Sequence, residues 1–245
     1  MPSPWKKKTK NYTNQTSLPL TQYNSPQTPF KMALAPQLDA LYSNFIANAP
    51  AAAAEPIIAA SSSFKASYDP STAIQVGEKL PKFVLSNAAG KEVSSTDLLA
   101  EGPLLITFYR GGWCPFCNIA LRGLQLHLDT FKSKGVTLVA ISPELPDHSL
   151  STAEKLELAF PVLSDVGNKY AKELGILWAM PDSLRPSFKN FGHDLPTVNG
   201  DDSFAVPIPA TFLVDAKGIV RNSFIDADYK KRLEPTQALE WVDAL

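Results

Sequence analysis

Cysteine is scarce in this chain: two occur among 245 residues, beside three methionines and three histidines. Two cysteines cannot form the disulfide framework of a small secreted domain. No apolar run approaches the roughly 20 residues that a membrane-spanning helix needs. Basic and acidic residues nearly balance, at 23 and 24, so the composition gives no sign of nucleic-acid binding. We therefore expect a soluble globular protein with neither a nucleic-acid nor a membrane partner.

The first 33 residues differ in composition from the rest. They are rich in Pro, Ser, Thr, Asn and Gln and show no helical or strand periodicity, so we expect a disordered tail over residues 1–33. Residues 1–38 carry five lysines and no acid, which leaves a transit peptide as the alternative to a dispensable extension. The tail lacks the apolar stretch of a secretory signal. The expected location is cytoplasmic, with a mitochondrial location as the alternative, and Met32 is a second candidate initiator.

Two helical segments precede the main domain. Apolar residues recur at helical spacing over 35–47, and after a break at Pro50 an alanine-rich segment runs to about Ala66. These segments predict a helical extension over residues 34–72. The remainder, residues 73–245, is expected to form one domain.

That domain alternates between apolar strands and amphipathic helices, which is typical of a βαβ unit. The first expected elements are a hairpin of 83–85 with 91–94 turning at Gly90, a strand at 104–109, a helix with its apolar face over 116–131 and a strand at 136–141. Two helices follow: one is opened by a capping box at Ser151 and Glu154, and the other lies between Asp165 and Gly175. The last expected elements are an irregular insertion at 178–205, a hairpin of 210–214 with 219–224, and a helix from Pro235. This order predicts an α/β fold in which a mixed central sheet carries helices on both faces.

The two cysteines, Cys114 and Cys117, lie three residues apart in the sequence WCPFC, where the first central strand passes into the first long helix. Free amides and the dipole at a helix N-terminus stabilise a thiolate there and lower its pKa. Pro115 suits a first helical turn, and the spacing brings both sulfurs within bonding distance. Such a dithiol attacks a disulfide or a peroxide; in the second case one sulfur becomes a sulfenic acid that the other condenses into a disulfide.

Three other interpretations of the pair stay open. Half of a zinc site would lack a second cysteine pair, and His127, His148 and His193 show no paired ligand spacing. Two buried, inert cysteines would have packing roles alone. A cysteine hydrolase would need a histidine beside the thiol, and nothing in the sequence places one there. Redox chemistry that uses no metal and no cofactor is the favoured interpretation.

Four segments around the dithiol and the neighbouring strands carry a resemblance to a known family. They are FYRGGWCPFC at 108–117, VAISP at 139–143, FPVLSD at 160–165 and PATFLVD at 209–215. The chain resembles the peroxiredoxin-like branch of the alkyl hydroperoxide reductase/thiol-specific antioxidant (AhpC/TSA) family over about residues 75–245. This resemblance implies a thioredoxin-like fold.

The resemblance also implies roles for particular residues. Peroxiredoxins carry a Pro seven residues, and a Thr or Ser three residues, before the peroxidatic cysteine; in that register Cys117 is peroxidatic, Arg110 replaces the Pro and Cys114 replaces the Thr. The Arg that those enzymes carry before the Thr-Phe strand is Pro209 here. Arg110 is therefore the candidate cation for the thiolate and the peroxide oxygens, or else pairs with a surface carboxylate. Unless Arg110 compensates, we expect hydrogen peroxide to be reduced about 100-fold or more slowly than by true peroxiredoxins.

A second resemblance is to thioredoxin, in which a cis-proline loop faces the dithiol and the first cysteine is the exposed nucleophile. It implies a cis Ile208–Pro209 peptide facing Cys114. Trp113, Pro209 and Thr211 are the candidate substrate-binding residues. The catalytic candidates are the two cysteines and the arginine named above.

The function that the resemblance implies is a thiol-dependent peroxidase. Cys117 would be oxidised by hydrogen peroxide or an organic hydroperoxide, and Cys114 would resolve the sulfenic acid to an internal disulfide. Thioredoxin or a glutathione-linked reductant would restore the dithiol, and a homodimer is a candidate assembly. The alternatives are a thiol–disulfide oxidoreductase acting on protein disulfides with Cys114 as nucleophile, and a non-enzymatic redox sensor. Residues 178–205, rich in aromatics and proline, suggest a lid over the dithiol.

Overall fold

The computed structural model describes residues 33–245, so the predicted tail lies, except for its last residue, outside the described part of the chain. The first elements are α1 (Leu34–Asn48) and α2 (Ala51–Ser67), separated at Pro50 as predicted. Among residues 33–245, no helix is both long and apolar enough to cross a bilayer. The division into an extension and a domain at residues 72 and 73 stays a prediction.

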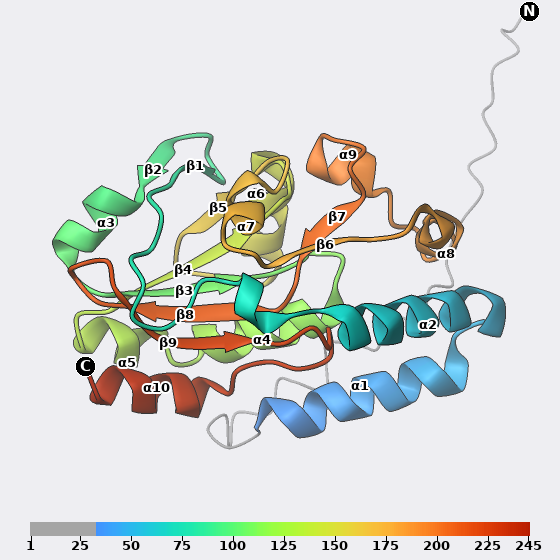
Figure 1. The fold of residues 1–245 in the computed structure, drawn as a ribbon, viewed down its shortest axis with the longest axis horizontal. Coiled ribbons are helices and arrows are strands. Elements are labelled where there is room, and N and C mark those ends of the chain that lie inside the picture. Colours follow the sequence, from blue (N-terminus) through green and yellow to red (C-terminus); the bar gives the residue numbers. More distant parts are fainter. Residues whose placement is uncertain (1–32) are drawn as a thin grey trace, which may run out of the picture. The chain divides into compact units, whose positions relative to one another are not determined.

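A seven-stranded mixed sheet lies at the centre of residues 33–245, with the strand order β2-β1-β5-β4-β3-β8-β9 (Figure 1). Its strands are β1 (Val84–Asn87), β2 (Glu92–Ser94), β3 (Leu104–Phe108), β4 (Thr137–Ser142), β5 (Val162–Ser164), β8 (Ala210–Val214) and β9 (Val220–Ile225). Strand β3 pairs parallel with β4 and antiparallel with β8. Both predicted hairpins form, and Gly90 has the expected positive φ of 75°. Strand β5 was not predicted because three residues are too few to show a period.

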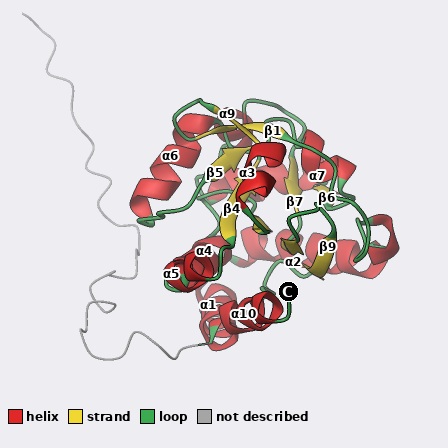
Figure 2. Ribbon diagram, turned by 90° about the vertical axis from the view of Figure 1, so that its left-hand side faces the viewer, coloured by secondary structure: helices red, strands yellow, loops and turns green. Residues whose placement is uncertain are grey.

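Helices cover both faces of the sheet, which confirms the predicted fold class. Besides α1 and α2 they are α3 (Ser95–Glu101), α4 (Pro115–Gln125), α5 (Leu128–Ser133), α6 (Pro146–Lys155), α7 (Lys169–Glu173) and α10 (Pro235–Asp243). Alternate residues of a strand face opposite sides, so Leu105 packs with α1, α4, α5 and α10, while Ile106 packs with α7. Figure 2 shows α1, α4, α5 and α10 beside one another. Helix α10 begins at Pro235, as predicted.

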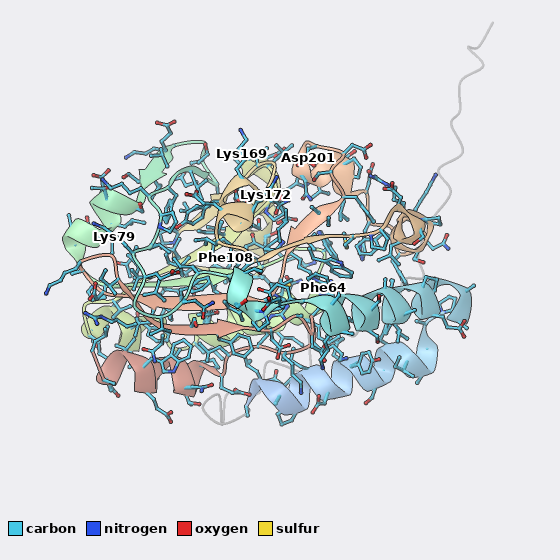
Figure 3. All side chains as sticks on the ribbon, in the orientation of Figure 1. Phe64, Lys79, Phe108, Lys169, Lys172 and Asp201 are labelled. Atoms are coloured by element: carbon cyan, nitrogen blue, oxygen red, sulfur yellow. The ribbon has the colours of Figure 1, made fainter. Side chains whose placement is uncertain are left out.

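Helix α2 packs on the opposite side from α1. Its Phe64, labelled in Figure 3, stacks on Trp178 with ring centroids 4.9 Å apart. Trp178 belongs to the buried cluster that contains Phe108 of β3, and Phe64 packs against that cluster. The two helices of the N-terminal extension therefore contact different layers of the domain.

The prediction of an irregular insertion at 178–205 was wrong for most of that segment. It contains the 3₁₀ turn Asp182–Leu184, α8 (Arg185–Asn190) and α9 (Leu195–Asn199), bracketed by the antiparallel pair β6 (Leu177–Ala179) and β7 (Ala205–Pro207). These helices are too short to show a hydrophobic period. Arg185 ties the segment together through Asp182 (2.7 Å) and Asp202 (2.6 Å).

Two helix boundaries also differ from the predictions. Helix α6 begins at Pro146, whose fixed φ suits a first turn, and Ser151 lies inside the helix, donating to the Asp147 backbone oxygen rather than forming a capping box. The helix expected over 116–131 is two helices, α4 and α5, separated at residues 126–127. The apolar face continues across this break, which is why periodicity did not reveal it.

The Ile208–Pro209 peptide is trans, because no peptide bond within residues 33–245 is cis. The prediction of a cis-proline loop was therefore wrong. Ile208 N donates to Ile176 O (2.8 Å), and Asp226 N donates to Pro209 O (3.1 Å). The chain thus keeps strand-like pairing on its way from β7 to β8, without the tight turn in which a cis-proline is usually found. The trans isomer, intrinsically favoured by about 0.5–1 kcal/mol, is retained.

Candidate active site

The two cysteines lie at the N-terminus of α4. Cys114 is the N-cap residue, Pro115 opens the helix, and Cys117 N donates to Cys114 O (3.0 Å). Their Sγ atoms are 2.6 Å apart, both are free thiols, and both residues are 0% exposed. The predicted dithiol is therefore assembled on one helical turn, in the field of the helix dipole.

Each sulfur contacts its own guanidinium. Arg110 Nη2 lies 3.2 Å from Cys114 Sγ, and Arg232 Nη2 lies 3.1 Å from Cys117 Sγ. Arg110 precedes Cys114 by four residues, whereas Arg232 comes from the segment between β9 and α10. Two cations thus bracket two sulfurs, one from near in the sequence and one from far away.

Arg110 is a buried cation, 6% exposed. Its guanidinium lies over the rings of Trp113 (5.1 Å) and Tyr229 (4.7 Å), and its Nε has no hydrogen-bond partner. Burial lowers the pKa of Arg110, but the charges of Cys114 and Cys117 raise it by more than burial lowers it. The pKa therefore lies above its ordinary value. Arg110 therefore stays protonated and keeps one N–H donor unused.

Arg232 is held by its own loop. Its Nη1 donates to the backbone oxygens of Tyr229 and Lys231, each at 2.6 Å, while its Nη2 donates to Cys117. The planar guanidinium thus joins the loop to the sulfur with a fixed direction, because its N–H groups form a rigid fork.

The two thiols differ in acidity. Burial raises the pKa of Cys117, but the hydrogen bond with Cys114 and the charges of Arg232 and Arg110 outweigh it, so this pKa lies well below its ordinary value. Burial, followed by the hydrogen bond to Cys117, raises the pKa of Cys114 well above its ordinary value. These opposite directions make Cys117 the more acidic sulfur of the pair.

The loop before the helix is packed against a buried acid. Glu144 Oε1 accepts from Gly112 N (2.9 Å), and Thr152 Oγ1 donates to Glu144 Oε2 (3.5 Å). Burial raises the pKa of this carboxyl. A Cβ on Gly112 would lie 2.0 Å from Thr152 Oγ1, and one on Gly111, where φ is +147°, would lie 2.3 Å from Trp113 Nε1. The two glycines let the loop lie this close to its neighbours.

A pocket of about 180 Å³ lies beside the dithiol, and its lining is mostly aromatic. It is lined by Phe45, Ile57, Arg110, Trp113, Pro115, Phe116, Phe188, Phe191, His193 and Tyr229. Trp113 packs edge-on against Phe188 (centroids 5.4 Å apart) and tilted against His193 (5.3 Å). The segment predicted as a lid therefore contacts the tryptophan next to Cys114.

The structure brings together four of the six predicted site residues: Cys114, Cys117, Arg110 and Trp113. Thr211 Oγ1 instead forms a hydrogen bond with Thr107 Oγ1 (3.0 Å) inside the sheet. Neither Pro209 nor Thr211 lines the pocket. The substrate-binding roles of Pro209 and Thr211 stay predictions.

Sequence reasoning missed Arg232 and Tyr229. Arg232 is 115 residues from Cys117, in a segment with no motif or period, beside Lys230 and Lys231. The one available signal was chemical: a buried thiolate needs a cation, and the usual arginine is absent. That signal does not say which of three neighbouring cations supplies the contact.

The mixed sheet with a dithiol at the N-terminus of its first central helix is the arrangement of a thioredoxin-like protein. Residues 76–223 match the model of the AhpC/TSA family. This chain therefore belongs to the AhpC/TSA family, and the resemblance seen in the sequence is confirmed.

Individual relatives agree with this assignment. The chain is 26% identical to Peroxiredoxin Bcp of Escherichia coli over 169 residues, which is 69% of this chain and 96% of that protein. It is 25% identical to Thiol-disulfide oxidoreductase ResA of Bacillus thuringiensis over 162 residues, 66% of this chain and 76% of that protein. The crystal structure of Peroxidoxin BcpB from Mycobacterium tuberculosis superposes with a TM-score of 0.55 and 19% identity, covering 70% of this chain and 98% of the other, which shows a shared fold.

Proposed function

We propose that this protein is a thiol-dependent peroxidase in which Cys117 is oxidised and Cys114 resolves the product. One observation carries the proposal: Cys117 Sγ contacts both Cys114 Sγ (2.6 Å) and Arg232 Nη2 (3.1 Å) at a helix N-terminus. A thiolate in that position has a cation and a second thiol within reach. Membership of the AhpC/TSA family and the similarity to Peroxiredoxin Bcp support it.

In the first step the Cys117 thiolate attacks an oxygen of the hydroperoxide. The S–O bond forms, the O–O bond breaks, and the leaving alkoxide or hydroxide takes up a proton to give an alcohol or water. Arg232 supplies a preorganised donor and positive charge where the leaving oxygen becomes negative.

In the second step the Cys114 sulfur attacks the sulfenic sulfur of Cys117. The S–S bond forms, and the sulfenic oxygen leaves as water with the proton of the Cys114 thiol. Thioredoxin or a glutathione-linked thiol then returns two electrons and two protons to the disulfide. An intracellular location belongs to the same proposal, since that environment keeps such thiols reduced.

Access requires a movement, because both cysteines are 0% exposed. Trp113 and its contacts Phe188 and His193 line the pocket beside the dithiol, whereas neither cysteine does. We include the lid in the proposal: residues 188–193 and Trp113 shift to admit the peroxide. Loops that close over a site commonly exclude water from the reaction in this way.

A thiol–disulfide oxidoreductase with Cys114 as nucleophile is the second candidate. The similarity to ResA and the WCxxC sequence favour it. The raised pKa of Cys114 opposes it, because the attacking sulfur must be ionised. The peroxidase is therefore the better-supported function.

The cysteine variants test the two candidates. We expect Cys117→Ser to consume no peroxide and to form no sulfenic acid, measured by turnover and by dimedone labelling. Cys114→Ser should still form the sulfenic acid but no internal disulfide. If Cys114→Ser instead abolishes reduction of a protein disulfide while Cys117→Ser still reacts with peroxide, the oxidoreductase holds. Oxidation of the wild type that stops after one equivalent with either reductant would indicate a sensor.

A further inference from the structure

A second pocket, which neither cysteine lines, lies where the two N-terminal helices meet the loop before α10. Its volume is about 110 Å³. Its lining includes Tyr42 of α1, Ser61 and Lys65 of α2, and Asp228 and Lys230 of the loop. All of its lining residues lie outside residues 76–223, so the pocket is separate from the segment that matches the family model.

The lining of this second pocket carries a positive charge. Two lysines meet one acid there: Lys65 Nζ lies 3.3 Å from Asp228 Oδ2, and Lys230 Nζ lies 3.1 Å from Asp228 Oδ1. Two positive charges and one negative charge leave a net charge of +1. An ammonium group has three N–H donors, so each lysine keeps donors for a further acceptor after its contact with Asp228.

The lysines are held in place without a ligand. Asp228 is buried and contacts both of them, and its Oδ1 also accepts from Lys230 N (3.2 Å). The Lys230 ammonium lies over the rings of Tyr42 (4.5 Å) and Tyr229 (5.6 Å). A side chain that is already ordered loses less freedom when it binds an anion, so these contacts favour binding.

A hydroxyl group in the same lining lacks a partner. Ser61 Oγ is buried and has no hydrogen-bond partner within residues 33–245, although a serine inside a helix can donate to the backbone of the preceding turn. A polar atom left buried and unpaired costs free energy, and an acceptor in the pocket would remove that cost. The ammonium groups and this hydroxyl are all able to donate, which suits an oxygen-rich anion.

The size of the second pocket limits the ligand. Its volume of about 110 Å³ is below that of an apolar cavity of about 150 Å³ that accommodates benzene in another protein. A tetrahedral oxyanion such as phosphate is more compact than an aromatic ring. It also presents several acceptor oxygens at once, so it can accept from both lysines and the serine.

We propose that this second pocket binds a small tetrahedral oxyanion, either inorganic phosphate or the phosphoryl group of an organic phosphate, through Lys65, Lys230 and the Ser61 hydroxyl. The inference goes beyond the proposed peroxidase function and does not rest on it. The ligand contacts the loop that supports Cys117, because the backbone oxygen of Tyr229 in that loop accepts from Arg232.

Isothermal titration calorimetry of the full chain with inorganic phosphate tests the site. We expect saturable binding of one ion per chain, which sodium chloride at the same ionic strength does not reproduce. Lys65→Gln and Lys230→Gln should each weaken binding about 10- to 100-fold, the usual loss for one hydrogen bond to a charged group. A second titration with glycerol phosphate distinguishes the sources: a higher affinity than that of phosphate indicates an organic phosphate, and an equal or lower affinity indicates the free ion.

Ser61→Ala separates the ligand contact from the stability of the loop. Because Ser61 Oγ has no partner within residues 33–245, this variant should unfold at the wild-type urea concentration but bind phosphate about 2- to 10-fold more weakly.

Ser63→Ala and Lys231→Gln are the matched controls. Both residues are exposed, neither lines the second pocket, and both variants should bind phosphate as the wild type does. The inference is overturned if neither phosphate nor glycerol phosphate binds saturably, if Lys231→Gln weakens binding as much as Lys65→Gln, or if Ser61→Ala keeps the wild-type affinity. Each of these results would leave the peroxidase proposal intact, since none of them concerns the reaction of Cys117.

Discussion

The segment that matches the family model and the segments that flank it contribute different parts of the site. Residues 76–223 supply both sulfurs and Arg110, and Arg110 contacts Cys114. The cation that contacts Cys117 is Arg232, beyond the matched segment. Both sulfurs thus lie within the segment that matches the family model, whereas Arg232, the cation at Cys117, lies beyond it.

The flanking segments hold each other in place. Glu234 accepts from Leu34 N (2.7 Å) and Ala35 N (2.8 Å) with its two carboxylate oxygens, at the N-terminus of α1. Lys65 of α2 forms an ion pair with Asp228 (3.3 Å). Both acids lie in the loop that carries Arg232. The N-terminal helices therefore clamp that loop, which means that their contacts with Glu234 and Asp228 hold it in place. They thereby stabilise the contact of Arg232 with Cys117.

Removing Arg232, the cation that contacts Cys117, should have the largest effect on the rate of oxidation. We expect Arg232→Ala to lower the second-order rate constant of Cys117 oxidation about 100- to 1,000-fold, the usual loss for one preorganised donor. Stopped-flow fluorescence of Trp113 with hydrogen peroxide measures it. Lys231→Ala is the control, because Lys231 is the exposed cation next in sequence and its side chain does not contact the sulfur.

The same variant bears on the expected slowness of the enzyme. That expectation rested on the arginine replaced by Pro209, with Arg110 as the candidate compensator. The structure puts Arg110 at Cys114 and Arg232 at Cys117, so we expect Arg232 to supply the donor that Pro209 cannot. A slow wild type that Arg232→Ala leaves unchanged would show that Arg232 does not act on the peroxide.

A smaller effect is expected in the pH dependence of Cys117 oxidation. The pKa of Cys117 lies well below its ordinary value, so we expect the oxidation rate to level off below about pH 8.5, the pKa of an ordinary thiol, and to stay flat above that point. The rate should fall only as the pH decreases through the lowered pKa. In Arg232→Ala the inflection should move upward, toward about pH 8.5, the pKa of an unperturbed thiol. A wild-type rate that still rises tenfold between pH 7 and 8 would contradict the thiolate assignment.

The sequence predicted well what depends on local pattern. Strand β3, the turn at Gly90 and the dithiol on the first turn of α4 each follow from residues close together in the chain. Strand β5 and helix α8 were not predicted, because segments of three to six residues show no hydrophobic period.

The site was predictable in its sulfurs but not in its surroundings. The spacing of Cys114 and Cys117 predicts a redox dithiol. Arg232, in contrast, contacts Cys117 only because the loop before α10 returns to the N-terminus of α4. The cis Ile208–Pro209 prediction failed for a related reason: it transferred a turn from thioredoxin, and here backbone pairing keeps that stretch extended.

The smallest expected effect tests the clamp itself. Glu234→Gln removes the charge from the N-terminus of α1 while keeping one acceptor oxygen, which should cost about 0.3–1 kcal/mol of unfolding free energy. Because the same residue holds the loop of Arg232, we also expect a few-fold slower oxidation of Cys117. Glu240→Gln removes an equal charge from an exposed site on α10 and should change neither quantity. If Glu234→Gln destabilises the protein in urea but oxidises at the wild-type rate, Arg232 reaches Cys117 without help from the N-terminal helices, and the flanks act independently of each other.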